Sequence, residues 1–518
     1  MTRYLKIGGM VLILWFTAKV CYSAPFAGNS FSENVKSTAG TGAAKKLILG
    51  KPFMSHMVLQ QKQPIPVWGA AGPDALITVK IGSQTRSVHA SREGSWRVVL
   101  HPMNPDGQKT MTISSSDGEK IILEDILVGE VWLCAGQSNM EFRLSQAVGG
   151  KVAVQESNHP EIRIFNFSGI VRPDAVAWNR TELERINHFE FFEGKWERCS
   201  PATSSGFSAI GYFFGTTLAA NRAVPVGLME IAVGGAPVEA FVDKKSLGQD
   251  SVLKKILVDW KHNELVMDWC RERAAQNLAG SENREQRHPF EPGYLYEAGV
   301  SQLAGFPIRG VIWYQGESNA HNASLYKLLL PALVVSWRKG WKAKTLPFYF
   351  AQLSGIERKG WPEFRDMQRN LARTVPSAGM VVTFDLGDSL NVHPTRKKEV
   401  GERFASLALH ECYGDRKAPL GPELKKVDLQ KDKLILTFDF TVALKTSNGS
   451  APREVEVAGA DGKFATVQAE IFGNKLIIGT KGLDPKVIRY GWKPFSRGNL
   501  VNEANLPVST FKYLLTNK

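Results

Sequence analysis

The chain has 518 residues, of which 43% are hydrophobic and 22% are charged, so it is a folded globular protein that is too long for one ordinary core. Its formal net charge at pH 7 is +14, but the Lys and Arg residues are scattered along the sequence. Because nucleic-acid-binding segments usually gather such residues into runs, this pattern indicates a solvated surface and no nucleic-acid partner.

Residues 1–23 predict an export signal. A positively charged start precedes the apolar stretch 8–18, which is too short to span a bilayer. Cleavage after Ser23 predicts a periplasmic or extracellular protein, and lipoprotein processing at Cys21 is a weaker alternative. Residues 24–46 are rich in Gly, Ala, Ser and Thr and predict a flexible leader. No other run suits a membrane span, so we expect no stable membrane insertion once the signal is removed.

Three segments follow. From 47 to 127, short apolar runs separated by Gly, Pro, Asp and Asn predict a β-sandwich. From 128 to 414, strands alternate with helices, which predicts an α/β domain whose parallel sheet is covered by helices on both faces. From 415 to 518 the helical period is lost, which predicts a β-rich region. The expected strands of the α/β domain are 131–133, 226–233, 310–315, 347–353 and 379–385, and its expected helices are 207–222, 324–339, 364–374 and 396–410.

Residues 244–288 interrupt that alternation. They are charged and helix-prone, with Trp260, Leu265 and Trp269 at helical spacing. We expect a helical insertion that either covers the active site or forms a surface hairpin.

The cysteines raise the question of disulfides and metals. Export would make Cys134, Cys199, Cys270 and Cys412 possible disulfide partners, and the sequence does not choose among their three pairings. Cys134 lies in an apolar strand and is expected to be a core residue. Because the spacing of the cysteines gives no zinc pattern, we expect no metal and no other cofactor.

The stretch 129–142, GEVWLCAGQSNMEF, holds the first candidate catalytic residue. Its apolar run ends at Gly136, as a buried strand does before a tight turn. A hydroxyl on Ser138 would therefore stand at the carboxyl edge of the sheet, where open α/β sheets carry their chemistry.

Three blocks occur in one order: GQSNM after GEVWLC, WYQGESN at 313–319, and a His-Pro pair before a helix. From about residue 47 to the end, the chain resembles the sialate O-acetylesterase family within the SGNH hydrolases. The resemblance implies an SGNH-type, flavodoxin-like sheet and a metal-free serine esterase that removes O-acetyl groups from sugars.

The ends of the predicted strands supply the other catalytic groups. A serine hydroxyl needs a base to accept its proton, and His393 is the candidate base. The resemblance implies an oxyanion hole made by the backbone amides of Ser138 and Gly235 and by one carboxamide, with Gln315 favoured over Asn319.

Four further residues are candidates for contacts with the substrate. Gln137 and Asn139 flank the serine. Glu317 is expected either to orient neighbouring loops, which we favour, or to contact sugar hydroxyls. Arg365 either points toward the sugar or fixes its helix to the sheet, and we favour the second role.

The residue that orients His393 is open. Many relatives read DIHP where this chain reads NVHP, so Asn391 stands in place of an acid. The orienting carboxylate is therefore Asp388 or Asp385, or else a backbone carbonyl takes the role and a Ser-His dyad operates.

The expected substrate is an acetylated carbohydrate. The resemblance implies O-acetylated sialic acid, whose carboxylate suits a basic protein, and acetylated xylan or pectin is the alternative within this enzyme class. A non-catalytic carbohydrate-binding protein on an esterase fold is the alternative outside it. The presence of both Ser138 and His393 argues against that alternative.

Overall fold

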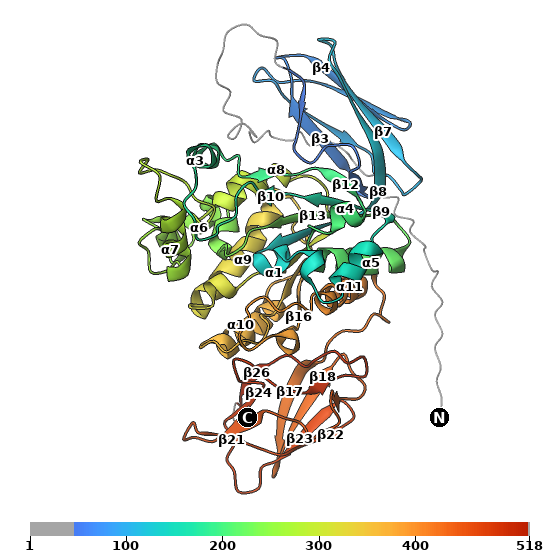
Figure 1. Ribbon diagram of the computed structural model, residues 1–518. Coiled ribbons are helices and arrows are strands. Elements are labelled where there is room, and N and C mark those ends of the chain that lie inside the picture. Colours follow the sequence, from blue (N-terminus) through green and yellow to red (C-terminus); the bar gives the residue numbers. More distant parts are fainter. Residues whose placement is uncertain (1–45, 516–518) are drawn as a thin grey trace, which may run out of the picture. The chain divides into compact units, whose positions relative to one another are not determined.

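The computed structural model describes residues 46–515 (Figure 1). The expected export signal, Cys21 and the leader up to residue 45 lie outside the described residues. Between residues 46 and 515, no helix combines the length and the apolar character needed to span a membrane.

Five strands form the parallel sheet that carries the candidate site. Their order across the sheet is β13 (Val226–Ala232), β8 (Lys120–Gly136), β14 (Gly310–Tyr314), β15 (Phe348–Ala351) and β16 (Ala378–Val381). Each neighbouring pair is parallel. Numbered along the chain, the order is 2-1-3-4-5, which is the flavodoxin-like arrangement. The predicted fold class is confirmed.

Two more strands extend this sheet beyond β13. β9 (His159–Asn166) is parallel to β13, and β12 (Trp196–Cys199) is antiparallel to β9. In the flavodoxin-like order, the strand order reverses between β8 and β14, and ligands bind at the carboxyl ends of the strands at that point. The nucleophile turn follows β8 directly.

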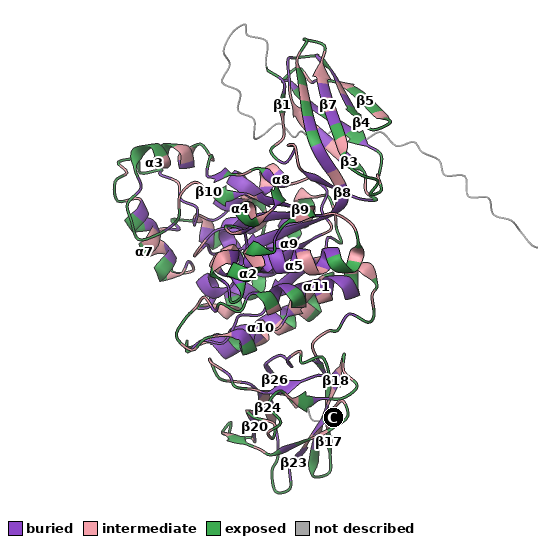
Figure 2. Ribbon diagram, turned by 45° about the vertical axis from the view of Figure 1, so that its right-hand side comes forward, coloured by how far each residue is buried: buried purple, intermediate pink, exposed green. Residues whose placement is uncertain are grey.

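Helices cover both faces of the sheet. Trp132 of β8 packs against Phe214 of α5 (Ala209–Arg222), with ring centroids 5.1 Å apart. Trp313 of β14 packs against Trp337 of α9 (Ala323–Gly340) at 5.8 Å. Trp313 is in register with Ala135, which points to the opposite face from Trp132. α5 and α9 therefore lie on opposite faces, and Figure 2 shows the buried strands between the helices.

The other two large helices complete these layers. α11 (Lys398–Tyr413) packs against α5, and α10 (Trp361–Thr374) packs against α9. The short elements of this part of the chain are α1 (Ser138–Glu141), η1 (Leu144–Gln146), α2 (Gly150–Gln155), β10 (Ser168–Gly169), α3 (Arg180–Asn187), β11 (Phe192–Glu193), α4 (Pro201–Ser204), η2 (Val238–Phe241), η4 (Tyr296–Val300), α8 (Ser301–Leu303), η5 (Glu317–Asn319) and η6 (Phe384–Leu386).

The segment 244–288 contains α6 (Lys244–Gln249), η3 (Leu253–Leu257) and α7 (Asp268–Asn277). The expected helical stripe differs from the structure, because only Trp269 of its three residues lies in a helix. The side chain of Asn263 donates to the carbonyls of Lys255 and Val258 at 2.8 and 2.9 Å, and these bonds stabilise turns there.

The N-terminal region consists of two antiparallel sheets. One sheet has the order β1 (Ile48–Leu49), β3 (Ile65–Ala70), β6 (Ser95–Leu100). The other has the order β5 (Gln84–His89), β4 (Leu76–Ile81), β7 (Lys109–Ser115), β8, and β2 (Val58–Gln60) pairs with β8 in parallel. β8 is 17 residues long and continues from this region into the catalytic sheet.

The C-terminal region has a hydrophobic cluster of its own, separate from the core that the other two regions share. Its strands are β17 (Glu423–Gln430), β18 (Lys433–Asp439), β19 (Lys445–Thr446), β20 (Val455–Ala458), β21 (Phe464–Thr466), β22 (Ala469–Phe472), β23 (Lys475–Gly479), β24 (Val487–Tyr490), β25 (Leu500–Val501) and β26 (Phe511–Leu514). They form two antiparallel four-stranded sheets and the short pair β19–β25.

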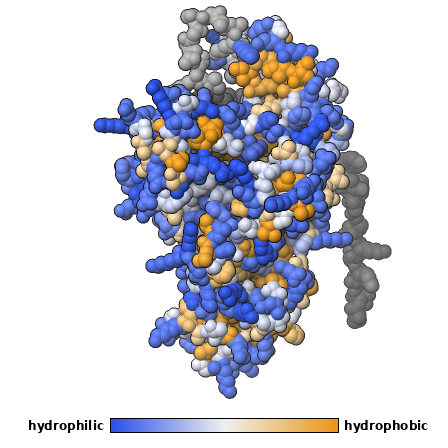
Figure 3. Space-filling view, viewed as in Figure 1, coloured by the Kyte–Doolittle hydropathy of each residue, from blue (hydrophilic) through white to orange (hydrophobic). Residues whose placement is uncertain are grey.

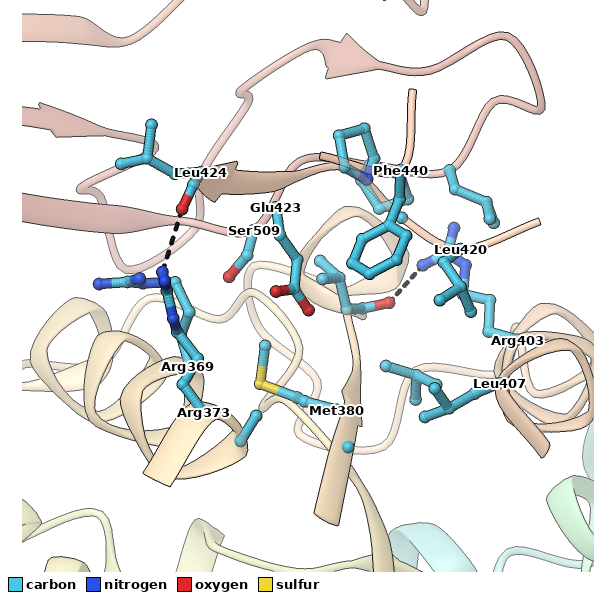
Figure 4. A pocket seen from close by; sticks show the side chains of 18 of the residues that line it. Arg369, Arg373, Met380, Arg403, Leu407, Leu420, Glu423, Leu424, Phe440 and Ser509 are labelled. Atoms are coloured by element: carbon cyan, nitrogen blue, oxygen red, sulfur yellow. Dashed lines mark hydrogen bonds between the residues drawn. The ribbon is translucent and has the colours of Figure 1, made fainter. Parts of the chain in front are cut away.

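A cavity of about 250 Å³ lies where the C-terminal region meets α10, β16 and α11 (Figure 4). Glu423 extends into it, and Arg373 donates to the carbonyl of Leu424 at 3.0 Å across the junction. Polar groups that line this cavity therefore also join the C-terminal region to the α/β domain. It shares no lining residue with the cavity at Ser138.

The four described cysteines are free thiols: Cys134, Cys199, Cys270 and Cys412. Cys134 is fully buried in β8, in agreement with its expected place in the core. On the face shown in Figure 3, hydrophilic residues separate the apolar ones into several groups, the clearest of which lies over the N-terminal region.

Candidate active site

The nucleophile turn is built at the end of β8. Gly136 has φ +142°, and a Cβ there would lie 2.1 Å from the carbonyl oxygen of Tyr314. Only glycine permits both that conformation and that approach. Gln137 N then donates to Tyr314 O at 3.0 Å, so the turn is fixed to β14, and Ser138 begins α1 half-buried.

Ser138 and His393 meet across this turn. The Nε2 atom of His393 lies 2.7 Å from the Oγ atom of Ser138, although the residues are 255 positions apart in the sequence. His393 lies on the loop between β16 and α11, and its backbone N–H donates to Oδ1 of Asn391 at 2.9 Å. A hydroxyl bonded to a ring nitrogen that can accept its proton is the arrangement of an activated serine nucleophile.

The two aspartates proposed to orient His393 are used elsewhere. Asp385 forms a bidentate ion pair with Arg403, with N–O distances of 2.7 and 2.6 Å. Asp388 accepts the backbone N–H groups of Leu390 and Asn391 at 2.8 and 3.0 Å. From residue 46 to residue 515, no carboxylate forms a hydrogen bond or ion pair with the His393 ring. Neither aspartate contacts the ring, so of the alternatives left open by the sequence the geometry favours the Ser-His dyad.

The carboxamides proposed for the oxyanion hole form hydrogen bonds with residues other than Ser138. Gln315 Nε2 donates to Asn319 Oδ1 at 2.6 Å and to Ala236 O at 3.3 Å. Asn319 Nδ2 donates to Glu239 at 2.8 Å, and its Oδ1 also accepts Val238 N. Neither residue lines the cavity at Ser138. Gln315 and Asn319 therefore stabilise the segment that follows Gly235, and neither lines the cavity as an oxyanion-hole donor would.

The glycine loop itself does line the cavity. Gly235 has φ +73°, and a Cβ there would lie 2.4 Å from the ring of Trp269. Its carbonyl accepts a hydrogen bond from Ser318 Oγ at 2.8 Å. The backbone at Gly234 and Gly235 is therefore held against the site without a side chain between it and a substrate.

The four candidate substrate contacts separate into two groups. Gln137 and Glu317 line the cavity, although Gln137 Oε1 also accepts the N–H groups of Gly316 and Ser318 at 3.3 and 3.4 Å. Asn139 is fully buried and outside the cavity lining. Arg365 is also fully buried, and it donates to three carbonyls of residues 491–494. Arg365 therefore joins α10 to the C-terminal region and does not contact substrate.

The cavity around Ser138 and His393 has a volume of about 760 Å³. Sequence patterns did not indicate its four arginines, because they come from four separate loops and helices with no shared motif. These are Arg143, Arg172, Arg273 and Arg358. Met267 and Trp269 also line it, so the insertion 244–288 contributes to the site.

Similar proteins point to one family. A family model described as carbohydrate esterase, sialic acid-specific acetylesterase, matches residues 281–410. The chain is 28% identical to sialate O-acetylesterase of Mus musculus over 435 residues, covering 75% of this chain and 78% of that one. It is 27% identical to the Homo sapiens protein of the same name over 433 residues, covering 75% and 76%.

A solved structure decides the assignment. The crystal structure of a carbohydrate acetylesterase from Xanthomonas citri is 32% identical to this chain, with a TM-score of 0.74, and covers 90% of this chain and 99% of its own. The chain belongs to the sialate O-acetylesterase family. It is thus a carboxylic ester hydrolase of the carbohydrate esterase class.

The environment of His393 sets the expected pH dependence of this family member. Burial lowers the pKa of His393, and the positive charges of Lys397 and Arg358 lower it further. Because only the neutral ring accepts the serine proton, kcat/KM for an acetyl ester should fall on the acid side at a pH below about 6.5, the ordinary histidine value.

Measurement of kcat/KM between about pH 4.5 and 8 checks this prediction. Arg358→Gln removes one positive charge near His393, so its acid limb should lie at higher pH than that of the wild type. Unfolding measured over the same pH range separates titration of the base from loss of structure. An acid limb above the ordinary histidine value in the wild type would contradict the prediction.

Proposed function

We propose that the protein removes O-acetyl groups from carbohydrates through a covalent acetyl-enzyme on Ser138. The observation that carries the proposal is the 2.7 Å contact between Ser138 Oγ and His393 Nε2 inside a cavity at the carboxyl edge of the sheet. The cavity volume of about 760 Å³ suits a sugar-sized molecule.

The reaction proceeds in two halves. His393 accepts the proton of Ser138 as Oγ attacks the acetyl carbonyl carbon, and the resulting oxyanion is stabilised by the backbone amides of Ser138 and Gly235. The tetrahedral intermediate then collapses, the C–O bond to the sugar breaks, and the imidazolium returns its proton to the sugar oxygen. Water, activated by the same ring, releases acetate and restores the serine.

We propose O-acetylated sialic acid as the substrate. Its carboxylate distinguishes it from acetylated xylose, and the cavity offers cations for it. Arg143 and Arg358 form no ion pair with any residue from 46 to 515, whereas Arg172 lies 3.6 Å from Glu141 and Arg273 donates to Pro173 O. Arg143 and Arg358 are therefore the guanidinium groups available to a bound carboxylate.

Replacing these two arginines should raise KM selectively. Arg143→Gln/Arg358→Gln is expected to raise KM for O-acetylated sialic acid by about tenfold or more, because a hydrogen bond to a charged group contributes about 1.5–3 kcal/mol. KM for 4-nitrophenyl acetate, which has no carboxylate, should change by less than about threefold. Assays at about pH 8 keep His393 neutral in both proteins.

Arg92→Gln is the matched control, because Arg92 is exposed in the N-terminal region and outside the cavity. Equal effects on both esters would contradict carboxylate recognition. A higher kcat/KM on acetylated xylan or pectin fragments than on acetylated sialic acid would assign the enzyme to those substrates instead. Binding of an acetylated sugar without release of acetate would favour the non-catalytic alternative.

The protein is proposed to act after export, in the periplasm or outside the cell. The support is the charged start and apolar stretch of residues 1–23. Fractionation of expressing cells, with detection of a mature chain that starts after Ser23, tests this proposal.

A further inference from the structure

Beneath Ser138 and His393 lies a buried polar group that the reaction above does not use. Asn139, Glu317 and Lys397 are 0%, 5% and 1% exposed. The Asn139 carboxamide lies between the other two: Nδ2 donates to Glu317 Oε1 at 2.5 Å, and Oδ1 accepts from Lys397 Nζ. The three residues come from the nucleophile turn, the loop after β14 and the start of α11.

The same carboxamide holds the loop that carries the base. Asn139 Nδ2 also donates to the backbone carbonyl of Val392 at 3.0 Å. Val392 and Lys397 are thus bonded to one side chain, and residues 393–396 form a loop closed on it. Since Asn139 directly follows Ser138, the nucleophile and the base share this attachment.

Charge decides which way the Asn139 carboxamide faces. An ammonium only donates and a carboxylate only accepts, so the observed orientation satisfies both. The reversed orientation would set the NH2 group against Lys397 and the oxygen against Glu317 and Val392 O. Lys397 is further held by the rings of Phe142 and Tyr314, at 4.8 and 5.6 Å from Nζ.

Lys397 can donate to Asn139 in either protonation state. Burial lowers the pKa of Lys397 to about 7, and Glu317 opposes that shift. A neutral amine still carries N–H groups that donate to Asn139 Oδ1. The attachment therefore does not depend on the ammonium form alone.

We propose that Lys397 and Asn139 are positioning residues that fix His393 through its main chain, in place of an aspartate bonded to the imidazole. The two candidate aspartates are used elsewhere, as described above. The backbone N–H of His393 donates to Asn391 Oδ1, and Pro394 restricts the backbone of His393. The loop is thus fixed before, at and after the base.

Lys397→Met tests the proposal, because methionine keeps most of the length between the two rings and removes the donor. With 4-nitrophenyl acetate, we expect kcat about a hundredfold lower, the scale of a misplaced catalytic group. KM should change by less than about threefold, since no contact to the acetyl group is lost. The acid limb should also move to higher pH, because Lys397 and Arg358 are the cations that lower the His393 pKa.

Asn139→Asp is the second variant. It tests the same proposal if Lys397→Met does not fold. It retains size and the bond to Lys397 but places a carboxylate oxygen against Glu317 and Val392 O, so kcat should fall by a similar factor. Lys398→Met, on the exposed neighbour that lies outside this group, is the matched control and should behave as the wild type. Folded variants with kcat within about threefold of the wild type would overturn the proposal.

A role in stability alone has a different signature and would also overturn it: a lower unfolding temperature with kcat and KM unchanged at temperatures where the variant is folded. The proposal rests on the proposed esterase function for its kinetic readout, so a second readout is included. Diisopropyl fluorophosphate phosphorylates an activated serine, with fluoride as the leaving group. Its reaction with Ser138, followed by the mass of the protein, should slow in Lys397→Met by the same factor as kcat. A wild type that is phosphorylated at Ser138 by this reagent but releases no acetate from any acetyl ester would overturn the esterase function and leave the positioning role measurable.

Discussion

Ser138→Ala is expected to lower kcat for acetyl-ester hydrolysis by about a millionfold, the scale seen when a serine nucleophile is removed from a hydrolase. The variant loses the atom that forms the acetyl-enzyme, and the remaining rate comes from substrate binding and oxyanion stabilisation alone. Release of acetate from an acetylated sugar, followed over long incubations, measures the loss. Mass spectrometry of quenched wild-type reactions should show an added acetyl group on the peptide that contains Ser138.

The fold should survive this change, because Ser138 is only half-buried and its hydroxyl contacts the His393 ring. Substrate binding by the variant, measured by calorimetry with the acetylated sugar, should remain close to the wild-type KM. Residual activity above about one part in a thousand would show that another group attacks the ester.

His393→Ala should cost about as much, about a millionfold in kcat, because the serine then loses its proton acceptor. The double variant Ser138→Ala/His393→Ala should be no slower than Ser138→Ala alone, since the two residues act as one unit. Rates of the two single variants and the double variant, measured on one acetyl ester, check this. Losses that simply multiply would show that Ser138 and His393 act independently.

Substitution of Asp388 or Asp385 tests whether either carboxylate orients His393. Asp388→Asn should lower kcat by less than about tenfold, because Asp388 caps the loop and does not touch the ring. Asp385→Asn should mainly weaken the ion pair with Arg403. A loss near ten-thousandfold in either variant, the scale for a neutralised triad aspartate, would restore that residue as the orienting acid.

The sequence was enough to predict that Ser138 and His393 lie close together, because both follow the ends of parallel strands. Parallel strands bring their carboxyl ends to one edge, so a serine after β8 and a histidine after β16 were expected to meet. The structure places their side chains in contact. The family was expected from the resemblance of three motif blocks. The α/β fold was predicted from strand and helix periods, which are local properties that the sequence displays directly.

The direction of loop side chains did not follow from the sequence. Gln315 and Asn319 stand beyond β14 as expected, but their amides bond to each other and to the glycine loop. Asp388 lies near the histidine, yet local backbone N–H groups compete for its carboxylate. Short polar side chains in turns commonly bond to nearby backbone, and that competition decides their orientation.

Lys397 and the cavity arginines were missed for a different reason. In the sequence, Lys397 is one of two adjacent lysines before a helix and looks like a surface residue. Its burial depends on Asn139, Phe142 and Tyr314, which approach it only in the folded chain. Long-range packing of this kind leaves no periodic pattern in a single sequence.

The length of β8 limits which regions of this enzyme can be exchanged during evolution. One uninterrupted strand pairs with β7 and β2 at its beginning and with β13 and β14 at its end, where it delivers the nucleophile. No linker therefore separates the N-terminal region from the catalytic sheet, and removing that region would strip the partners from half of the strand. The N-terminal region and the serine therefore belong to one strand, so neither can be exchanged without the other.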